Sequence, residues 1–320
     1  MNQPPHNDQA FDLALVDIVD YCFSTDDFPL STLENARTAL MDAMSCAFLS
    51  LRDTQCQNHL APFTANTNIS NGVSVPGTQL QFDPVQAAYH ITCMIRWLDY
   101  NDTWLAKEWG HPSDNLGAIL ACAHYFSQQT AHVPWSIEDI LKAITMAYEI
   151  QGVLALENSF NELGFDHVIL VRIASTAVAV KLLGGDRQQM LNALSNAFLD
   201  GAALRTYRHG KNTGARKSWA AADASSRGVW LAIQAMNGEP GYATALSAET
   251  WGFNAVILGN KPLIRSQPYQ HYVLDNILYK IAYPVEFHAQ TAVECAIKLY
   301  AQMDTATKTG VADIDYIHLY

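Results

Sequence analysis

Apolar residues recur at intervals of three and four along most of the chain, which is the spacing of one buried face on an α-helix. Within residues 11–23, for example, the apolar positions include Leu15, Ile18, Val19 and Cys22. The same spacing predicts further helices at residues 33–51, 84–98, 116–126, 136–156, 165–183, 186–199, 218–237 and 293–303. The hydrophobic pattern therefore indicates a mainly α-helical fold.

One of these segments, residues 165–183, is apolar on almost every side. A helix of this kind is typical of the middle of a bundle, where neighbours cover all of its faces. Capping side chains mark the starts of other helices: Asp83 before a proline, Ser136, and Asp186 after a pair of glycines. Since each of these stands directly before an apolar helical pattern, they support the predicted boundaries.

Three further predictions concern boundaries and strands. Residues 31–34, Ser-Thr-Leu-Glu, have the form of a capping box. Residues 58–82 are rich in Asn, Ser, Thr and Gly and are expected to form loops and turns. We therefore expect about ten helices before any convincing strand. The alternation typical of a strand appears only at 311–320, where a lone strand would have no partner. Residues 1–9 are expected to be disordered.

The composition is that of a globular protein with a large core, because 49% of the 320 residues are hydrophobic and 16% are charged. No apolar run is long enough to cross a membrane, and the N-terminus lacks the features of a secretory signal. None of the six cysteines belongs to a Cys-x-x-Cys pair, and most lie within apolar helical patterns. We expect buried, reduced thiols in a cytoplasmic protein, with no disulfide framework, zinc site or iron–sulfur cluster.

The formal net charge is −12, so the chain is expected to repel nucleic acids and anionic membranes. Residues 201–222 are the exception, because they contain no Asp or Glu. The cations of this acid-free segment are Arg205, Arg208, Lys211, Arg216 and Lys217. They indicate a site for a small anion, with a solvated cationic loop as the alternative.

The candidate chemistry lies between two apolar helices, at residues 96–115. Asp99 and Asp102 would stand one helical turn apart if the preceding helix continued that far, and two adjacent carboxylates raise one pKa as a general acid or base requires. The alternative is that Asp102 is a cap and Asp99 is paired with Arg96. His111, held between Gly110 and a proline, is either part of this proton-transfer set or a structural donor.

A plainer interpretation of the same stretch is a surface connection, in which Ser113 and Asp114 cap the following helix. Lys280 also has two interpretations. Its neighbours are apolar or aromatic, so it is either a site residue or a surface lysine whose stem covers apolar neighbours. Lys217 and Arg216 stand at a predicted helix start, where free N–H groups and the helix dipole favour anions.

Several of these segments resemble a known family. Leu-Asp-Tyr-Asn-Asp-Thr-Trp at 98–104 and Gly-His-Pro-Ser-Asp-Asn at 110–115 resemble the signature of the 2-methylcitrate dehydratases of the MmgE/PrpD family. Three more matches are Leu-Gly-Phe-Asp-His-Val-Ile-Leu-Val at 163–171, Ala-Arg-Lys-Ser-Trp-Ala-Ala-Ala at 215–222, and the segment 279–291. The matches extend from the candidate loop to the last fifty residues, so the resemblance covers nearly the whole chain.

The resemblance implies a lyase that dehydrates 2-methylcitrate to 2-methyl-cis-aconitate in propionate breakdown, without a metal ion or other cofactor. Citrate and cis-aconitate are further candidate substrates. It assigns Asp99 and His111 as the acid/base pair, with Thr103 and His167 as supporting polar groups. The expected carboxylate-binding residues are Lys217, Lys280, Arg216 and Arg205. The acid-free segment fits this substrate, because a tricarboxylate needs cations around it.

The resemblance also implies an architecture. Residues 1–275 would form a large helical domain, and residues 276–320 the beginning of a smaller α/β lid domain. Members of the family continue well beyond this length, so we expect the lid to be incomplete and the 320-residue chain to have little activity. The family also implies a homodimer built from the helical domain. The alternatives to a dehydratase are a related cis-aconitate decarboxylase and an inactive helical fragment that acts only in dimerisation.

Overall fold

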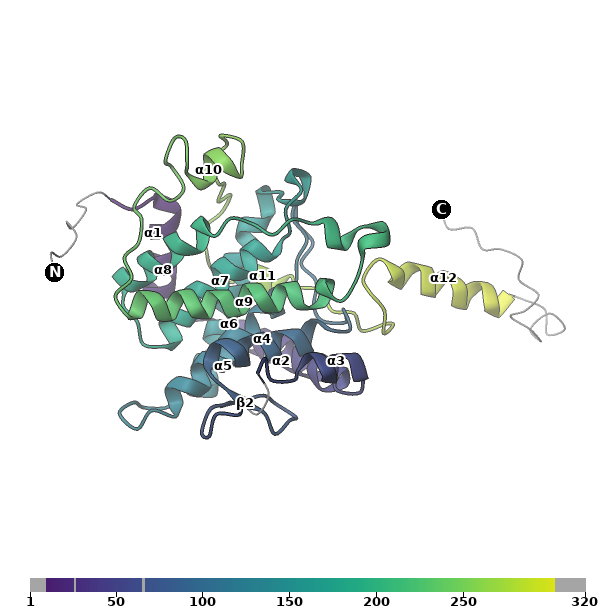
Figure 1. Cartoon of the computed structure of the whole chain (residues 1–320). Coiled ribbons are helices and arrows are strands. Elements are labelled where there is room, and N and C mark those ends of the chain that lie inside the picture. Colours follow the sequence, from purple (N-terminus) through teal and green to yellow (C-terminus); the bar gives the residue numbers. More distant parts are fainter. Residues whose placement is uncertain (1–9, 26, 65–66, 303–320) are drawn as a thin grey trace.

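The centre of the fold is a fully surrounded helix, α7 (Val168–Leu182), as the apolar segment 165–183 predicts. Every residue of α7 except Lys181 is buried. The long helix α9 (Arg216–Met236) packs across α7 and across α4 (Pro84–Arg96) (Figure 1). This arrangement brings the end of α4, the start of α7 and the start of α9 together at one end of the bundle.

The computed structural model describes residues 10–25, 27–64 and 67–302. The other helices of the body are α1 (Leu13–Ser24), α2 (Leu30–Ser50), α3 (Thr54–His59), α5 (Leu116–Ser127), α6 (Ile137–Glu157), α8 (Arg187–Leu199), α10 (Phe253–Val256) and α11 (Tyr272–Asp275). The last described helix is α12 (Ala289–Gln302). Four short 3-10 turns are η1 (Pro112–Asn115), η2 (Asn161–Leu163), η3 (Thr206–Arg208) and η4 (Gly210–Asn212). The mainly α-helical fold is therefore confirmed.

Three predicted helix caps are confirmed. The side chain of Asp83 accepts hydrogen bonds from the first N–H groups of α4. Ser136 and Asp186 begin α6 and α8 with complete capping boxes. The capping box predicted at residues 31–34 is wrong, because α2 begins one residue after Pro29, and the N-cap makes no side-chain hydrogen bond.

The prediction that only loops and turns occupy residues 58–82 is also wrong. This range contains the end of α3 and an antiparallel pair of strands, β1 (Val73–Ser74) and β2 (Gln81–Phe82). These strands follow only three helices, so the expected order of about ten helices before any strand does not hold. Each strand has two residues, which is too short to show the period-2 alternation by which strands are predicted. The strand predicted at 311–320 and the disorder predicted at 1–9 lie outside the described residues.

A glycine explains how closely α7 and α9 approach. A Cβ atom on Gly228 of α9 would lie 2.9 Å from the backbone nitrogen of Thr176 and 3.0 Å from Cβ of Ser175. Any larger residue would separate the two helices, and with them the side chains at their N-terminal ends. The sequence of α9 is thus adapted to the position of the site as well as to the core.

The segment 270–280, which includes α11, packs against the helical body. Glu149 of α6 accepts hydrogen bonds from the backbone N–H groups of Gln270 and Val273, both at 2.9 Å. Further along, Leu278 exchanges two backbone hydrogen bonds with Thr103, at 2.8 and 3.1 Å. These contacts fix the course of the chain up to the candidate site residue Lys280.

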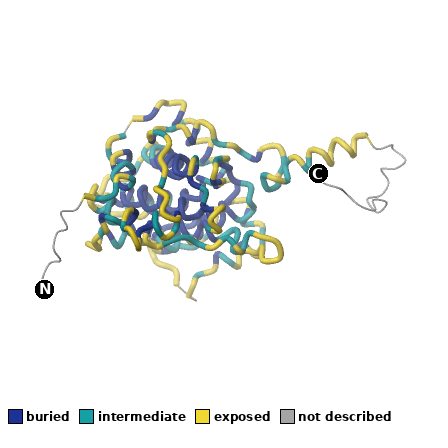
Figure 2. The backbone as a smooth tube through the Cα atoms, turned by 90° about the horizontal axis from the view of Figure 1, so that it is seen from above, coloured by how far each residue is buried: buried dark blue, intermediate teal, exposed yellow. Residues whose placement is uncertain are grey.

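α12 lies to one side of this body, and none of its residues is buried (Figure 2). A boundary between a helical domain and a lid at residues 275/276 stays a prediction. Five of the six cysteines are buried and all six are free thiols, as expected, with Cys295 exposed. None of the described helices combines the length and apolar character needed to cross a lipid bilayer.

Candidate active site

The loop that follows α4 carries most of the candidate residues. α4 ends at Arg96, and Asp99 has a φ of 56°, in the left-handed region that ends helices. Asp99 and Asp102 are therefore not on one face of a helix, as the sequence suggested. Backbone pairs order the loop instead: Thr103 pairs with Leu278, and Trp104 pairs with Gly110.

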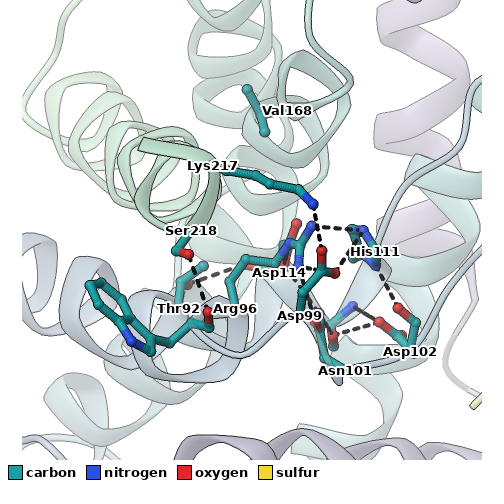
Figure 3. Close-up of polar contacts among 12 residues, drawn as sticks. Thr92, Arg96, Asp99, Asn101, Asp102, His111, Asp114, Val168, Lys217 and Ser218 are labelled. Atoms are coloured by element: carbon teal, nitrogen blue, oxygen red, sulfur yellow. Dashed lines mark hydrogen bonds and ion pairs between the residues drawn. The ribbon is translucent and has the colours of Figure 1, made fainter. Parts of the chain in front are cut away.

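Four basic groups surround the carboxylate of Asp99, and three of them, Arg96, His111 and Lys217, are labelled in Figure 3. Its Oδ1 atom lies 2.5 Å from Nη1 of Arg96, 3.6 Å from Nζ of Lys280 and 3.9 Å from Nε2 of His111. Its Oδ2 atom lies 2.9 Å from Nζ of Lys217. Burial by itself raises the pKa of Asp99, but the four basic groups together hold it well below its usual range. Asp99 is therefore ionised. The predicted pairing of Asp99 with Arg96 is confirmed, and Lys217 and Lys280 are further cations beside the same carboxylate.

Lys280 is a buried residue, and the interpretation as a surface lysine is wrong. Its ammonium group donates to the backbone carbonyl of Asn101 at 2.6 Å, and its side chain has no exposed area. Burial lowers its pKa, while Asp99 opposes that change. Lys280 therefore lies next to Asp99 with Lys217, the other cation expected to bind a carboxylate.

Hydrogen bonds define the tautomer of His111. Nη2 of Arg96 lies 2.9 Å from Nε2 of the imidazole, and an arginine can only donate. Nε2 is therefore the acceptor, and Nδ1 carries the proton and donates to the backbone carbonyl of Asp102 at 2.6 Å. Burial, with Arg96 and Lys280, lowers the pKa of His111 well below its usual value. His111 is thus a neutral imidazole held on both sides.

Asp102 orders the loop and does not share a titration with Asp99. Its carboxylate accepts from the backbone N–H of Ser113 at 3.2 Å and from the Ser113 hydroxyl at 2.6 Å. The pKa of Asp102 is raised, as the sequence suggested. The main cause is burial of the carboxyl group and not repulsion by Asp99. Ser113 and Asp114 do not cap α5, because both are buried and Asn115 is the N-cap residue.

His167 stands at the N-cap of α7, where the sequence placed it at the mouth of the buried helix. Its ring lies 5.7 Å from that of His111, edge to face. Nδ1 of His167 is 3.1 Å from Oδ1 of Asp166, and Arg208 forms an ion pair with the same carboxylate. The site therefore continues from His111 to His167 and into the start of α7.

Three of the five cations of the acid-free segment lie near acids from other parts of the fold. Arg208 pairs with Asp166, Lys217 pairs with Asp99, and Arg205 lies 3.9 Å from Glu108. Arg216 lies instead over aromatic rings, with its guanidinium 4.4 Å from the ring centroid of Trp219 and 5.0 Å from that of Tyr207. Of the four cations predicted to bind carboxylates, the structure thus brings Lys217 and Lys280 to Asp99 and directs the side chains of Arg205 and Arg216 to other partners.

Sequence reasoning missed two buried residues of the site. Arg96 was considered only as a partner for Asp99, yet it contacts Asp99 and His111 and its side chain is 2% exposed. Asp114 was considered only as a cap, yet it is fully buried, with Oδ1 3.8 Å from Nε of Arg96. A charged residue within a segment as apolar as α4 is the signal that could have identified Arg96.

A pocket of about 280 Å³ opens beside these residues, lined by Gln55, Arg96, Trp97, Asp99, Gly214, Ala215, Lys217 and Ser218. Thr103 lies deeper, and its hydroxyl has no hydrogen-bond partner among the described residues. Within the same described ranges, no group of three or more His, Cys, Asp or Glu side chains is arranged to hold a metal ion. Of the candidate residues, Asp99 and Lys217 line this pocket, and Lys280 and His111 lie within 4 Å of Asp99.

Comparison with known proteins gives a consistent result. Residues 17–265 match the family model described as the MmgE/PrpD N-terminal domain. The chain is 51% identical over 310 residues to a protein of Escherichia coli (strain K12) named 2-methylcitrate dehydratase, with 96% of this chain and 64% of that protein covered. A protein of the same name from Cupriavidus necator is 51% identical, with 98% and 64% covered.

A fungal protein is also similar. The "2-methylcitrate dehydratase, mitochondrial" of Yarrowia lipolytica is 47% identical, with 97% of this chain and 59% of that protein covered. The chain thus spans about three fifths of the length of the curated relatives that it matches. It matches them along nearly its whole length, from the first helices to the segment that carries Lys280.

Proposed function

The chain belongs to the MmgE/PrpD family, and on this premise we propose that it dehydrates 2-methylcitrate to 2-methyl-cis-aconitate. The observation that carries the proposal is the cluster around Asp99, where Lys217, Lys280 and Arg96 meet one carboxylate beside an open pocket. A tricarboxylate requires cations of this kind, and the proteins named 2-methylcitrate dehydratase are about half identical to this chain. The reaction would be the dehydration step of propionate breakdown.

The cations would serve both binding and catalysis. A substrate carboxylate that reaches Lys217 and Lys280 replaces Asp99 as their partner. Removal of a proton from the adjacent carbon then builds negative charge on that carboxylate, and the same two ammonium groups stabilise it. Because these groups are partly or fully buried, water weakens the interaction less than it would at the surface.

Asp99 and His111 would handle the proton. Asp99 is ionised and so can accept a proton from carbon, and its basicity increases once a substrate takes over its cations. As the carbon–carbon double bond forms, the carbon–oxygen bond breaks and the hydroxyl leaves. It needs one proton to leave as water. His111, whose Nε2 lies 3.9 Å from Asp99, would take up that proton and return it to the leaving oxygen.

The other predicted residues would support the site without taking part in the proton transfer. The unpartnered hydroxyl of Thr103 is available to a substrate oxygen. The ring of His167 lies against that of His111. Arg205 and Arg216, which have other partners, would contribute positive potential around the pocket. We propose no metal ion or other cofactor for this reaction.

The absorbance of the unsaturated product tests the proposal. Purified protein is supplied with 2-methylcitrate, with citrate and cis-aconitate as parallel substrates and with chelator in a matched sample. We expect turnover of 2-methylcitrate that survives chelation, weak in the 320-residue chain and higher in the same chain extended by the C-terminal part of a relative. In the extended chain we expect losses of about a hundredfold or more in His111→Ala and Lys217→Ala. Lys261→Ala, at an exposed position, is the control.

Three results would contradict parts of this proposal. Absence of turnover both in the folded 320-residue chain and in the extended chain would contradict the dehydratase activity, and complete loss on chelation would contradict the metal-free reaction. Release of carbon dioxide from cis-aconitate, without turnover of 2-methylcitrate, would instead indicate the decarboxylase alternative.

We also propose a homodimer formed through the helical domain, located in the cytoplasm. Large apolar side chains on α2 support the dimer, because Met41, Phe48 and Leu49 are 60, 49 and 39% exposed. The free thiols support a reducing compartment. Light scattering during size-exclusion chromatography measures the mass directly, and a monomer at micromolar concentration would contradict the dimer.

A further inference from the structure

Asp114 is the buried charged group that the proposed chemistry leaves without a role. It has no exposed surface and lies behind the residues that face the pocket. Its Oδ1 atom lies 3.8 Å from Nε of Arg96 and accepts a long hydrogen bond, 3.4 Å, from Asn101. Its Oδ2 atom lies 4.0 Å from Nε2 of His167. Asp114 therefore connects the buried guanidinium beneath Asp99 with the imidazole at the start of α7.

Three buried atoms that lack a hydrogen-bond partner among the described residues meet at this point. They are Nε of Arg96, Oδ2 of Asp114 and Nε2 of His167. A buried polar atom without a partner is costly, and unpartnered groups scattered through a core are rare. All three atoms lie at or beside the carboxyl group of Asp114. A slight approach of Arg96 and His167 to this group would therefore give them hydrogen-bond partners.

The partner of Nδ1 of His167 determines whether Nε2 of the same ring is a donor or an acceptor. Nδ1 faces the Asp166 carboxylate at 3.1 Å, and Arg208 makes two contacts with that carboxylate. Burial raises the pKa of Asp166, but His167 and Arg208 hold it well below its usual range, so Asp166 is an acceptor. Nδ1 therefore carries a hydrogen, and a neutral His167 presents a lone pair at Nε2. A carboxylate opposite that lone pair would repel it, whereas a carboxylic acid would donate to it.

One proton can thus lie either on Asp114 or on Nε2 of His167, and burial together with the surrounding charges decides between them. Arg208, Arg96 and Arg205 surround His167 and disfavour an imidazolium, although Asp166 opposes them. Asp102 and Asp99 lie near Asp114 and disfavour a second carboxylate there, although Arg96 and Arg208 oppose them. Burial acts first in both cases: it lowers the pKa of His167 to about 3 and raises that of Asp114 to about 7. The proton therefore belongs to Asp114.

We propose that Asp114 is a positioning residue that, below neutral pH, is a neutral carboxylic acid and directs its proton at Nε2 of His167. This contact fixes the tautomer and orientation of the His167 imidazole against the ring of His111. A movement of about 1 Å converts the 4.0 Å separation into a hydrogen bond, as expected if the site tightens around its substrate. The protonation state is a property of the free protein, and only its effect on turnover rests on the proposed function.

Nuclear magnetic resonance tests the protonation state without any substrate. The protein is labelled with ¹³C at Asp carboxyl carbons and ¹⁵N in His rings, and Asp114→Asn identifies the Asp114 signal by its loss. We expect a protonated Asp114 carboxyl at pH 6 that titrates near or above neutrality, and a His167 ring protonated only at Nδ1. An Asp114 signal that is already ionised at pH 6, or an imidazolium at His167, would overturn the proposal.

Turnover provides the second test, because asparagine mimics the neutral acid and cannot ionise. We expect Asp114→Asn to keep most of kcat/KM for 2-methylcitrate at neutral pH. At alkaline pH, kcat/KM should decrease less in this variant than in the wild type. Asp114→Ala lacks a donor and should lose about a hundredfold. Equal loss in both variants at every pH would overturn the role of the proton. If the wild type does not turn over 2-methylcitrate at all, the proposed function fails, while the resonance measurement still decides the state of Asp114.

Discussion

The ammonium group of Lys280 donates to the backbone carbonyl of Asn101 at 2.6 Å, although 179 positions separate the two residues in the chain. This contact, with the backbone pair between Leu278 and Thr103, joins the segment after α11 to the loop after α4. The positive charge of Lys280 is thereby held near Asp99 by the fold itself. Lys280 does not depend on a bound anion for its position.

Replacement of Lys280 by Met should abolish most of the activity. The apolar chain fills a similar volume, but it removes a buried cation 3.6 Å from Asp99 and so weakens both substrate binding and charge stabilisation. We expect kcat/KM for 2-methylcitrate to fall by about a hundredfold or more. Lys261→Met, at an exposed position, should behave as the wild type. A Lys280→Met protein that folds normally and retains activity within a few fold would exclude Lys280 from the site.

Replacement of Arg96 by Met should reduce stability more than any exposed ion-pair variant. Its guanidinium is buried between Asp99 and Asp114 and also donates to His111. Removal of the partner leaves buried acids without compensation, which costs about 3–5 kcal/mol in the free energy of unfolding. Denaturant unfolding measures this, with Arg37→Ala as the control, because the exposed Arg37–Glu34 pair should contribute less than about 1 kcal/mol. Similar losses in the two variants would show that Arg96 is not a central support.

Substitution of Gly228 by Ala tests the close packing of α7 and α9. The added methyl group would lie 2.9 Å from a backbone atom of Thr176, and rigid backbone cannot move aside at low cost. We expect a loss of about 1–3 kcal/mol in the free energy of unfolding. Gly214→Ala is the matched control, since its nearest neighbour would be 4.0 Å away. A neutral Gly228→Ala would mean that the helices can separate without consequence.

His167 should make the protein less stable as the pH falls below about 6.5. Burial lowers the pKa of His167 to about 3 in the folded protein, whereas the unfolded chain has the ordinary value of 6.5. At a pH between these two values, the unfolded state binds more protons than the folded state. Stability therefore rises with pH across this window, by up to about 1.4 kcal/mol per unit from this residue. We expect the melting temperature of His167→Gln to depend less steeply on pH between 5 and 7 than that of the wild type. An unchanged slope would show that His167 is already protonated in the folded state.

The sequence determined the helical fold and most helix boundaries, and it indicated several candidate site residues. Hydrophobic periodicity predicted α7 as the buried centre, and Asp83, Ser136 and Asp186 predicted three helix starts, because these signals depend on neighbours within a few positions. The family resemblance indicated Asp99, His111, Lys217 and Lys280, which the structure brings together; their roles stay predictions. The strands of the short hairpin escaped prediction because two residues cannot show a period.

Only the tertiary structure decided how these residues act on one another. Arg96 and Asp114 come together with Asp99, His111 and His167 because α4, α7 and α9 meet at one end of the bundle, a proximity that no local pattern encodes. Burial at that meeting point controls the charges, ionising Asp99 among four basic groups while it raises the pKa of Asp114 and lowers that of His167. The desolvation of a charged group depends on everything packed around it, and for this reason the protonation states of the site follow from the fold and not from the order of residues.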